Sequence, residues 1–145
     1  MSHYCEDNFL PVQRIGFALR KAHNLFITEM DVALADIGVS SSHAGALLLL
    51  SLGIARSSVG LSRLLGVNAG FVTRVVDRLE RQGLVQRDRN SPDRRVVNLT
   101  LTEAGRTVAA RIAEIVPAVL NQRLSAFSPP EFVALCQLLS KLLDE

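Results

Sequence analysis

Arginines dominate the middle of the chain. Between Arg56 and Arg95, nine arginines stand against four acidic residues, so this segment carries a net charge of +5, whereas the remainder carries −3. Guanidinium groups pair with phosphate oxygens and guanine edges, and a basic block between acidic flanks is typical of a surface that binds a polyanion. An ordinary solvated surface is the alternative. We interpret the segment as a nucleic-acid interface.

Residues suited to other chemistry are sparse. The sequence contains no Ser elbow, HExxH, Walker or dinucleotide-binding motif, and its only histidines are His3, His23 and His43. Together with Cys5 these lack the spacing of metal ligands. We therefore expect no enzymatic activity, no catalytic residue, no metal and no cofactor.

Two helical patterns position the arginines. Ser57 is a good N-cap for a short helix over residues 59–65, and Gly66 supplies the positive φ of a tight turn. Asn68 is a good N-cap for a second helix that ends at Gly83. Apolar residues with helical spacing are expected to point inward: Leu61, Leu64 and Leu65 from the first helix, and Val72, Val75, Val76 and Leu79 from the second.

The outward face of the second helix begins with small residues and continues with arginines, which suits close approach to base edges in a major groove. Thr73 and Arg74 are the best candidates for base and phosphate contacts. Asp77 is expected to brace an arginine across the interface. The candidate DNA-binding residues here are Ser57, Arg63, Asn68, Ala69, Gly70, Thr73, Arg74 and Arg78.

A hairpin follows, in which strand-like runs at residues 84–87 and 96–101 enclose turn residues at 89–93. Arg94 and Arg95 lie near its tip. A solvated loop is the alternative to a hairpin that binds DNA.

Long helices flank this unit. The first, ending at Gly38, is apolar on two sides, which indicates a second subunit as one of its covers. A buried helix over residues 43–51 follows the N-cap Ser40. Another long helix begins at Thr102, and Pro117 should kink or break it. Ser128 caps a last, strongly apolar helix.

The chain has 145 residues, of which 48% are hydrophobic, enough for one folded unit. We expect a mainly α fold with a small β wing: an N-terminal arm and dimerisation helix (1–36), a winged helix-turn-helix domain (37–101), and a connecting helix with a C-terminal dimerisation helix (102–145). No signal pattern is present, and the uncharged run over residues 37–55 holds too short an apolar part for a membrane span, which needs about 20 residues. Cytoplasmic localisation follows.

Motifs in a fixed order carry a resemblance. They are Gly66-Val67-Asn68 at the turn, the run from Val72 to Glu80, Gly83-Leu84-Val85, Asp93-Arg94-Arg95, and the run from Leu101 to Gly105. In this set and order, the chain resembles the MarR family (multiple-antibiotic-resistance regulators) of winged-helix transcription factors over nearly its full length.

The resemblance implies a triangular homodimer whose first and last helices form the dimerisation lobe. Its two recognition helices would enter successive major grooves of a near-palindromic operator in double-stranded DNA. Arg95 matches the wing arginine that enters the minor groove, where A·T-rich sequence concentrates negative potential. Asp93 would orient the wing arginines.

The chain departs from the family in two places. Ile15-Gly16-Phe17 stands where peroxide-sensing members carry a reactive cysteine. The alternative of a thiol-based redox regulator would therefore use Cys5, which lies upstream in the N-terminal arm. Gly70 stands where a serine or threonine is common, which removes a phosphate-contacting hydroxyl. A winged helix that contacts only other proteins is a further alternative, and the central charge of +5 argues against it.

The resemblance also implies a repressor that a small phenolic compound or aromatic carboxylate releases from DNA. Arg20, His23 and Phe26 share one face of the first helix, and His43 begins the buried second helix. A cation, imidazoles and a ring suit an aromatic acid, so these four are the candidate ligand-binding residues. The alternative is that His23 and His43 form their hydrogen bonds within a core or an interface and bind no ligand.

Overall fold

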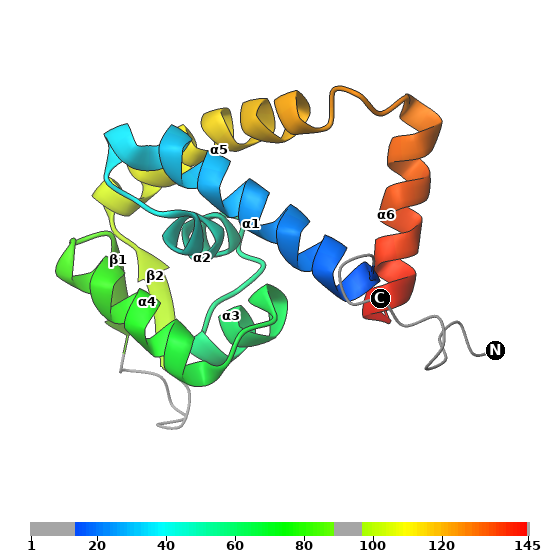
Figure 1. Cartoon of the computed structure of the whole chain (residues 1–145). Coiled ribbons are helices and arrows are strands. Elements are labelled where there is room, and N and C mark those ends of the chain that lie inside the picture. The colour runs from blue at the N-terminus through cyan, green and yellow to red at the C-terminus, as the bar shows by residue number, and fades with distance from the viewer. Residues whose placement is uncertain (1–13, 89–96, 145) are drawn as a thin grey trace.

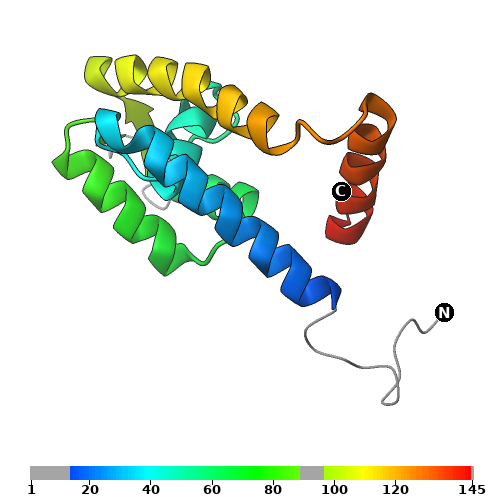
Figure 2. The ribbon, with the colours of Figure 1, turned by 45° about the horizontal axis from the view of Figure 1, so that its top comes forward.

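The computed structural model describes residues 14–88 and 97–144 of the chain. Helix α1 (Ile15–Leu34) runs along one side of a lobe that contains α2 (Ser41–Ser51), α3 (Ser58–Leu65), α4 (Ala69–Arg81) and the strands β1 (Val85–Asp88) and β2 (Asn98–Leu101) (Figure 1). Helix α5 (Glu103–Arg123) leaves this lobe beside α1. The last helix, α6 (Pro129–Leu143), stands away from the lobe (Figures 1 and 2).

The described part of α1 begins at Ile15 after the N-cap Arg14, and residues 1–13 lie outside the described residues. The α-helix ends at Leu34 and a 3-10 turn, Ala35–Ile37, follows. Gly38 then adopts a φ of 72°, which a glycine reaches without the clash of a Cβ atom. The predicted stop at Gly38 is thus confirmed, although the final turn is 3-10 rather than α.

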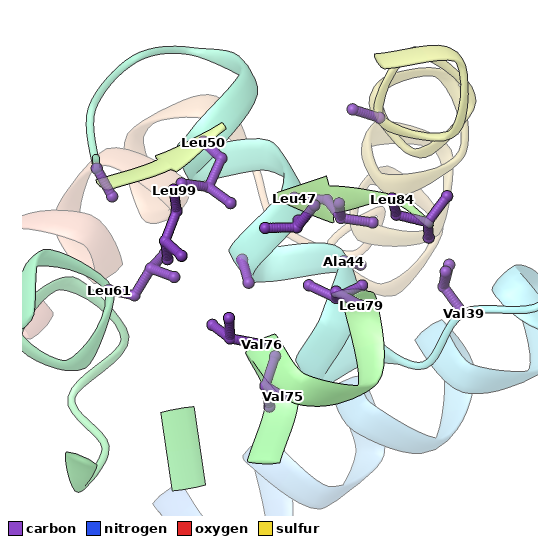
Figure 3. Close-up of a cluster of buried hydrophobic side chains, with 14 of the residues drawn as sticks. Val39, Ala44, Leu47, Leu50, Leu61, Val75, Val76, Leu79, Leu84 and Leu99 are labelled. Atoms are coloured by element: carbon purple, nitrogen blue, oxygen red, sulfur yellow. The ribbon is translucent and has the colours of Figure 1, made fainter. Parts of the chain in front are cut away.

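The core lies where α2, α4, β1, β2 and the first half of α5 meet (Figure 3). The four residues predicted on the inward face of α4 are all buried, and Leu47 and Leu61 meet them from α2 and α3. Burying a Val or Leu side chain contributes about 1.5–3 kcal/mol, so this cluster holds α2, α3 and α4 together. Leu34, at the end of α1, is also fully buried and anchors α1 to the lobe.

The prediction for Leu64 is wrong, because its side chain keeps 44% of its surface exposed. Helix α3 has only eight residues, and its single fully buried position is Leu61. A helix of this length packs against the core through the turn around Leu61, so apolar residues on the next turn, such as Leu64, lie at the edge of the core. Helix α2 also begins two residues earlier than predicted, at Ser41.

The predicted hairpin is confirmed in its described part. Strands β1 and β2 pair antiparallel, with Val85 opposite Leu101 and Asp88 opposite Asn98. The segment before α3 joins this sheet, since the N–H of Leu99 donates to the carbonyl of Arg56 over 2.8 Å. The residues between the strands, 89–96, lie outside the described part.

Pro117 was predicted to kink or break the long helix, and it does not break it, because α5 continues through it to Arg123. The kink stays a prediction. A proline removes one helical hydrogen bond, here the one to the carbonyl of Ala113. Both Ala113 and Pro117 are exposed. Water can therefore hydrogen-bond to that carbonyl in place of the missing N–H.

The predicted N-cap Ser128 begins α6, and its N–H donates to Glu131 Oε2 over 2.8 Å. No described side chain of α6 is buried: Leu138, Leu142 and Leu143 are exposed, and Leu135 and Leu139 are half-buried. Along α1, Phe17, Leu25 and Val32 are exposed as well. Apolar side chains on both helices are therefore left in contact with solvent in the single chain.

Among residues 14–88 and 97–144, no single helix is long and apolar enough to cross a membrane. The division of the chain at residues 36/37 and 101/102 stays a prediction.

Candidate nucleic-acid interface

Local hydrogen bonds define the turn between α3 and α4. The hydroxyl of Ser57 accepts from the N–H of Gly60 over 3.2 Å, and Asn68 Oδ1 accepts from the N–H of Phe71 over 2.8 Å. Both predicted N-caps are confirmed. Between them, Gly66 has a φ of 64°, and the Ser62 hydroxyl donates to the carbonyl of Val67 over 2.5 Å. The two helices are therefore held at a steep angle by their own side chains.

Helix α4 separates an apolar face from a basic one. Its inward valines and Leu79 are buried, whereas Arg74, Arg78 and Arg81 on the other side are exposed. The exposed face starts with Ala69 and Gly70. A Cβ atom added at Gly70 would meet Asn68 Oδ1 at 3.4 Å, which is an ordinary van der Waals contact, so packing does not require a glycine here. Its lack of a side chain leaves the helix backbone accessible at this point.

The other candidate DNA-binding residues lie around the same face. Thr73 is exposed and donates to the carbonyl of Ala69 over 2.9 Å, which leaves its oxygen available as an acceptor. Arg63 is exposed at the end of α3, and Ser57 is half-buried at its start. The wing residues Asp93, Arg94 and Arg95 lie outside the described residues.

Arg87, which was not among the candidate DNA-binding residues, forms the main ion-pair network of this region. From strand β1 its guanidinium donates to Asp77 Oδ1 over 2.6 Å and to Glu80 Oε2, both on α4. Burial alone lowers the pKa of Arg87, but hydrogen bonds and charges from Asp77 and Glu80 outweigh it, so the pKa is raised. Asp77 was expected to form an ion pair with an arginine. Its partner is Arg87, which lies in strand β1 at the base of the wing.

The C-terminal end of α4 is fastened to the long helices on both sides. Gln82 Nε2 donates to the carbonyl of Gly38 over 3.3 Å, at the end of the α1 segment. The Thr102 hydroxyl donates to the carbonyl of Gly83 over 2.6 Å, and the N–H of Thr102 donates to the carbonyl of Leu84 over 3.1 Å. These bonds connect the residues after α4 to the end of the α1 segment and to the start of α5.

The four candidate ligand-binding residues do not share one cavity. Arg20 lines a shallow pocket of about 270 Å³ on α1, with Phe17 and Leu25. His23 is exposed and Phe26 half-buried on the same helix. None of the three cavities described here is lined by His23, Phe26 or His43.

His43 lies at the start of α2, beside the recognition helix. Its Nδ1 is 2.6 Å from the Ser40 hydroxyl, at hydrogen-bond distance. Burial lowers the pKa of His43, the positive charge of Arg78 lowers it further, and Asp31 opposes both. These surroundings favour a neutral imidazole, which fits the alternative of a histidine satisfied within the fold.

Two larger cavities lie along α5. One of about 740 Å³ is bounded by the end of α2, strand β2 and α5, where Ala109, Ala110 and Ala113 leave room and Arg56 and Arg106 supply positive charge. The other, of about 600 Å³, lies between α1 and the end of α5. Beside it, Arg123 Nε donates to Glu29 Oε2 over 3.0 Å and ties the two helices together.

Comparison with known proteins gives a consistent result. The model of the MarR family matches residues 48–97, a span that runs from α2 through α3 and α4 to the wing. A probable transcriptional regulator from Pseudomonas aeruginosa is 28% identical, with a TM-score of 0.80 over 90% of this chain and 97% of that one.

Two further solved structures are similar. One is the transcriptional repressor CouR bound to a 23-mer DNA duplex, at 26% identity and a TM-score of 0.79, covering 94% of this chain and 99% of that one. The other is BpsR of Bordetella bronchiseptica, whose DNA binding is regulated by 6-hydroxynicotinic acid; it is 22% identical, with a TM-score of 0.83 over 94% of this chain and 98% of that one.

Proposed function

Because the chain belongs to the MarR family of DNA-binding transcriptional regulators, we propose that it is a homodimeric repressor that a small aromatic or phenolic acid releases from its operator. The single observation that carries the DNA-binding part is the basic, exposed face of α4, backed by a fully buried apolar face. A regulator of this kind acts in the cytoplasm, on double-stranded DNA.

Uncovered apolar surface supports the dimer. Phe17, Leu25 and Val32 on α1 are exposed in the single chain, and so are Leu138, Leu142 and Leu143 on α6. A two-fold dimer built on α1, α5 and α6 would cover them. It would present two copies of α4, and binding to successive major grooves of a near-palindromic operator would require them to lie about one helical turn of DNA apart.

We assign the phosphate and base contacts to the exposed residues around the start of α4. Ala69 and Gly70 allow close approach, Thr73 and Arg74 reach base edges and phosphate, and Arg78 follows one turn later. Ser57, Arg63 and Asn68 would contact the backbone from the turn. In the wing, Arg95 and Arg94 would enter the minor groove, with Asp93 orienting them.

Replacing Arg74 or Arg95 by alanine tests this assignment. Each change should weaken operator binding by about 1–3 kcal/mol, because one charge-assisted contact is lost. The measurement is a fluorescence-anisotropy titration of a labelled operator at two salt concentrations. Arg111→Ala is the matched control, since Arg111 is an exposed arginine of α5 away from α4. If Arg74→Ala and Arg95→Ala bind as tightly as Arg111→Ala, the contact assignment is wrong.

We assign the effector to the class of small aromatic acids because BpsR, which shares the fold, is regulated by one such acid. We take two of the described cavities as candidates, because each has an arginine beside apolar surface: the one with Arg20 on α1, and the one with Arg106 and Arg56 between β2 and α5, which Asp88 also lines. A charge-assisted hydrogen bond to the carboxylate and contact with the ring would bind the acid at either one.

A panel of aromatic acids tests the effector. A binding acid at a hundredfold excess over its Kd should stabilise the chain by about 2.7 kcal/mol and release the operator. Thermal unfolding and anisotropy report the two effects. Arg20→Met and Arg106→Met then separate the two sites, because only the variant at the true site should lose both responses. A panel that neither stabilises the chain nor releases DNA argues against a ligand-controlled repressor.

A further inference from the structure

Arg87 occupies an unusual place for an arginine of a DNA-binding lobe. Its side chain is only 18% exposed and lies at the base of the wing, on β1, under the recognition helix. One guanidinium nitrogen donates to Asp77 Oδ1 over 2.6 Å and the other terminal nitrogen donates to Glu80 Oε2. A planar guanidinium that forks between two carboxylates is held in one geometry, because both of its terminal nitrogens are engaged.

The two carboxylates stand on the helix that must approach DNA. Asp77 and Glu80 keep 47% and 42% of their side-chain surfaces exposed, and they alternate along α4 with Arg74, Arg78 and Arg81. An unpaired carboxylate next to a phosphate backbone is repelled, and like charges brought together across an interface cost several kcal/mol. The recognition helix therefore carries two charges that oppose its own task unless they are neutralised.

We propose that Arg87 is a built-in counter-ion of the recognition helix: its positive charge offsets one of the two negative charges of Asp77 and Glu80, and its hydrogen bonds hold both carboxylates, so that α4 can approach phosphates. In this proposal Arg87 makes no contact with DNA itself. The inference rests on the DNA-binding function of α4. It makes Arg87 a positioning residue whose whole effect on affinity passes through two carboxylates.

The geometry favours this role over a direct phosphate contact. An arginine that binds phosphate keeps a terminal nitrogen open to the solvent side, as the exposed Arg74 and Arg78 do. Both terminal nitrogens of Arg87 instead donate to carboxylates of the same lobe, those of Glu80 and Asp77, seven and ten residues earlier in the chain. If Arg87 broke these hydrogen bonds to contact DNA, Asp77 and Glu80 would lose their partner, and this loss would offset the free energy gained from the new phosphate contact.

A mutant cycle with the full-length protein and a labelled operator duplex tests the proposal. Arg87→Met removes the charge at similar length, and the pair Asp77→Asn with Glu80→Gln removes the carboxylates at constant size. Arg87→Met should reduce affinity about tenfold or more, since two carboxylates lose their counter-ion. The neutral pair should bind at least as tightly as the unchanged protein. Adding Arg87→Met to the neutral pair should change affinity by less than about threefold, because no charge is left to neutralise.

Thermal unfolding of each variant shows whether a loss of affinity comes from a loss of folded protein. Arg111→Met is the arginine control outside the network. The proposal is overturned if Arg87→Met has no effect, or if it weakens the neutral pair as much as it weakens the unchanged protein. The second result would mean that Arg87 contacts DNA or acts through geometry alone. If the unchanged protein binds no DNA, the DNA-binding function itself fails, which is a different result from either.

Discussion

Gly105→Ala is expected to destabilise the chain by about 3 kcal/mol or more, the upper end of the range for overpacking. A Cβ atom at this position would lie 2.0 Å from the carbonyl oxygen of Leu84 and 2.9 Å from its carbonyl carbon. The clash is with backbone, so no side chain can swing aside. Two neighbouring bonds fix the same approach: Thr102 caps α5 by accepting from the N–H of Gly105 over 3.0 Å, and it bonds to Gly83 and Leu84.

Gly16→Ala is the matched control for Gly105→Ala. Gly16 also lies in a helix, but an added Cβ there meets nothing within 4 Å. Gly16 lies in the first turn of the described helix, so alanine there should leave stability unchanged or raise it by at most roughly 0.5–1 kcal/mol, the figure for a helix interior, and only Gly105→Ala should destabilise the chain. Urea unfolding followed by circular dichroism measures both. Equal effects would mean that α5 and the end of α4 do not meet as closely as described.

Converting the apolar face of α6 to a charged one should have the second large effect. Leu142 keeps 53% of its surface exposed and Leu135 lies on the same helical face seven residues earlier, where a partner is proposed to cover them. Leu135→Glu with Leu142→Glu would place four carboxylates in a two-fold interface. The dimer should dissociate, and operator affinity should fall by about 100-fold or more, because the second half-site is no longer bound by the same molecule.

The control for this pair adds the same charge to the opposite side of α6. Gln137→Glu with Ser140→Glu should leave the dimer and its operator affinity intact, since both residues lie on the polar face of the helix. Sedimentation equilibrium gives the mass, and anisotropy gives the affinity. If the leucine pair remains a dimer with full affinity, α6 does not form the dimer interface.

Local rules account for what the sequence predicted well. Ser57, Asn68 and Thr102 cap their helices through bonds to an N–H three residues on, a geometry that depends only on neighbouring residues. The inward stripe of α4 follows from helical periodicity, and the turn at Gly66 from a positive φ that glycine adopts readily. The recognition unit was predictable because nearly all of its determinants lie within one turn of the chain.

Contacts between distant segments account for what could not be predicted. The partners of Arg87 depend on how β1 lies under α4, and only the spacing of Asp77 and Glu80 on one helical face could have hinted at an arginine between them. The exposure of Leu64 depends on how far α3 extends past the core. The candidate ligand residues were grouped by their positions on two helices, whereas the structure places Arg20 and His43 near different partners.

The most direct test of the account is a hydroxyl-radical footprint of the full-length protein on a duplex selected from a random-sequence library. A dimer with two copies of α4 in successive major grooves predicts two protected tracts separated by about 10 base pairs, two chains per duplex, and an affinity that falls steeply with added salt. A single protected tract with one chain bound, or binding that does not depend on salt, would contradict it.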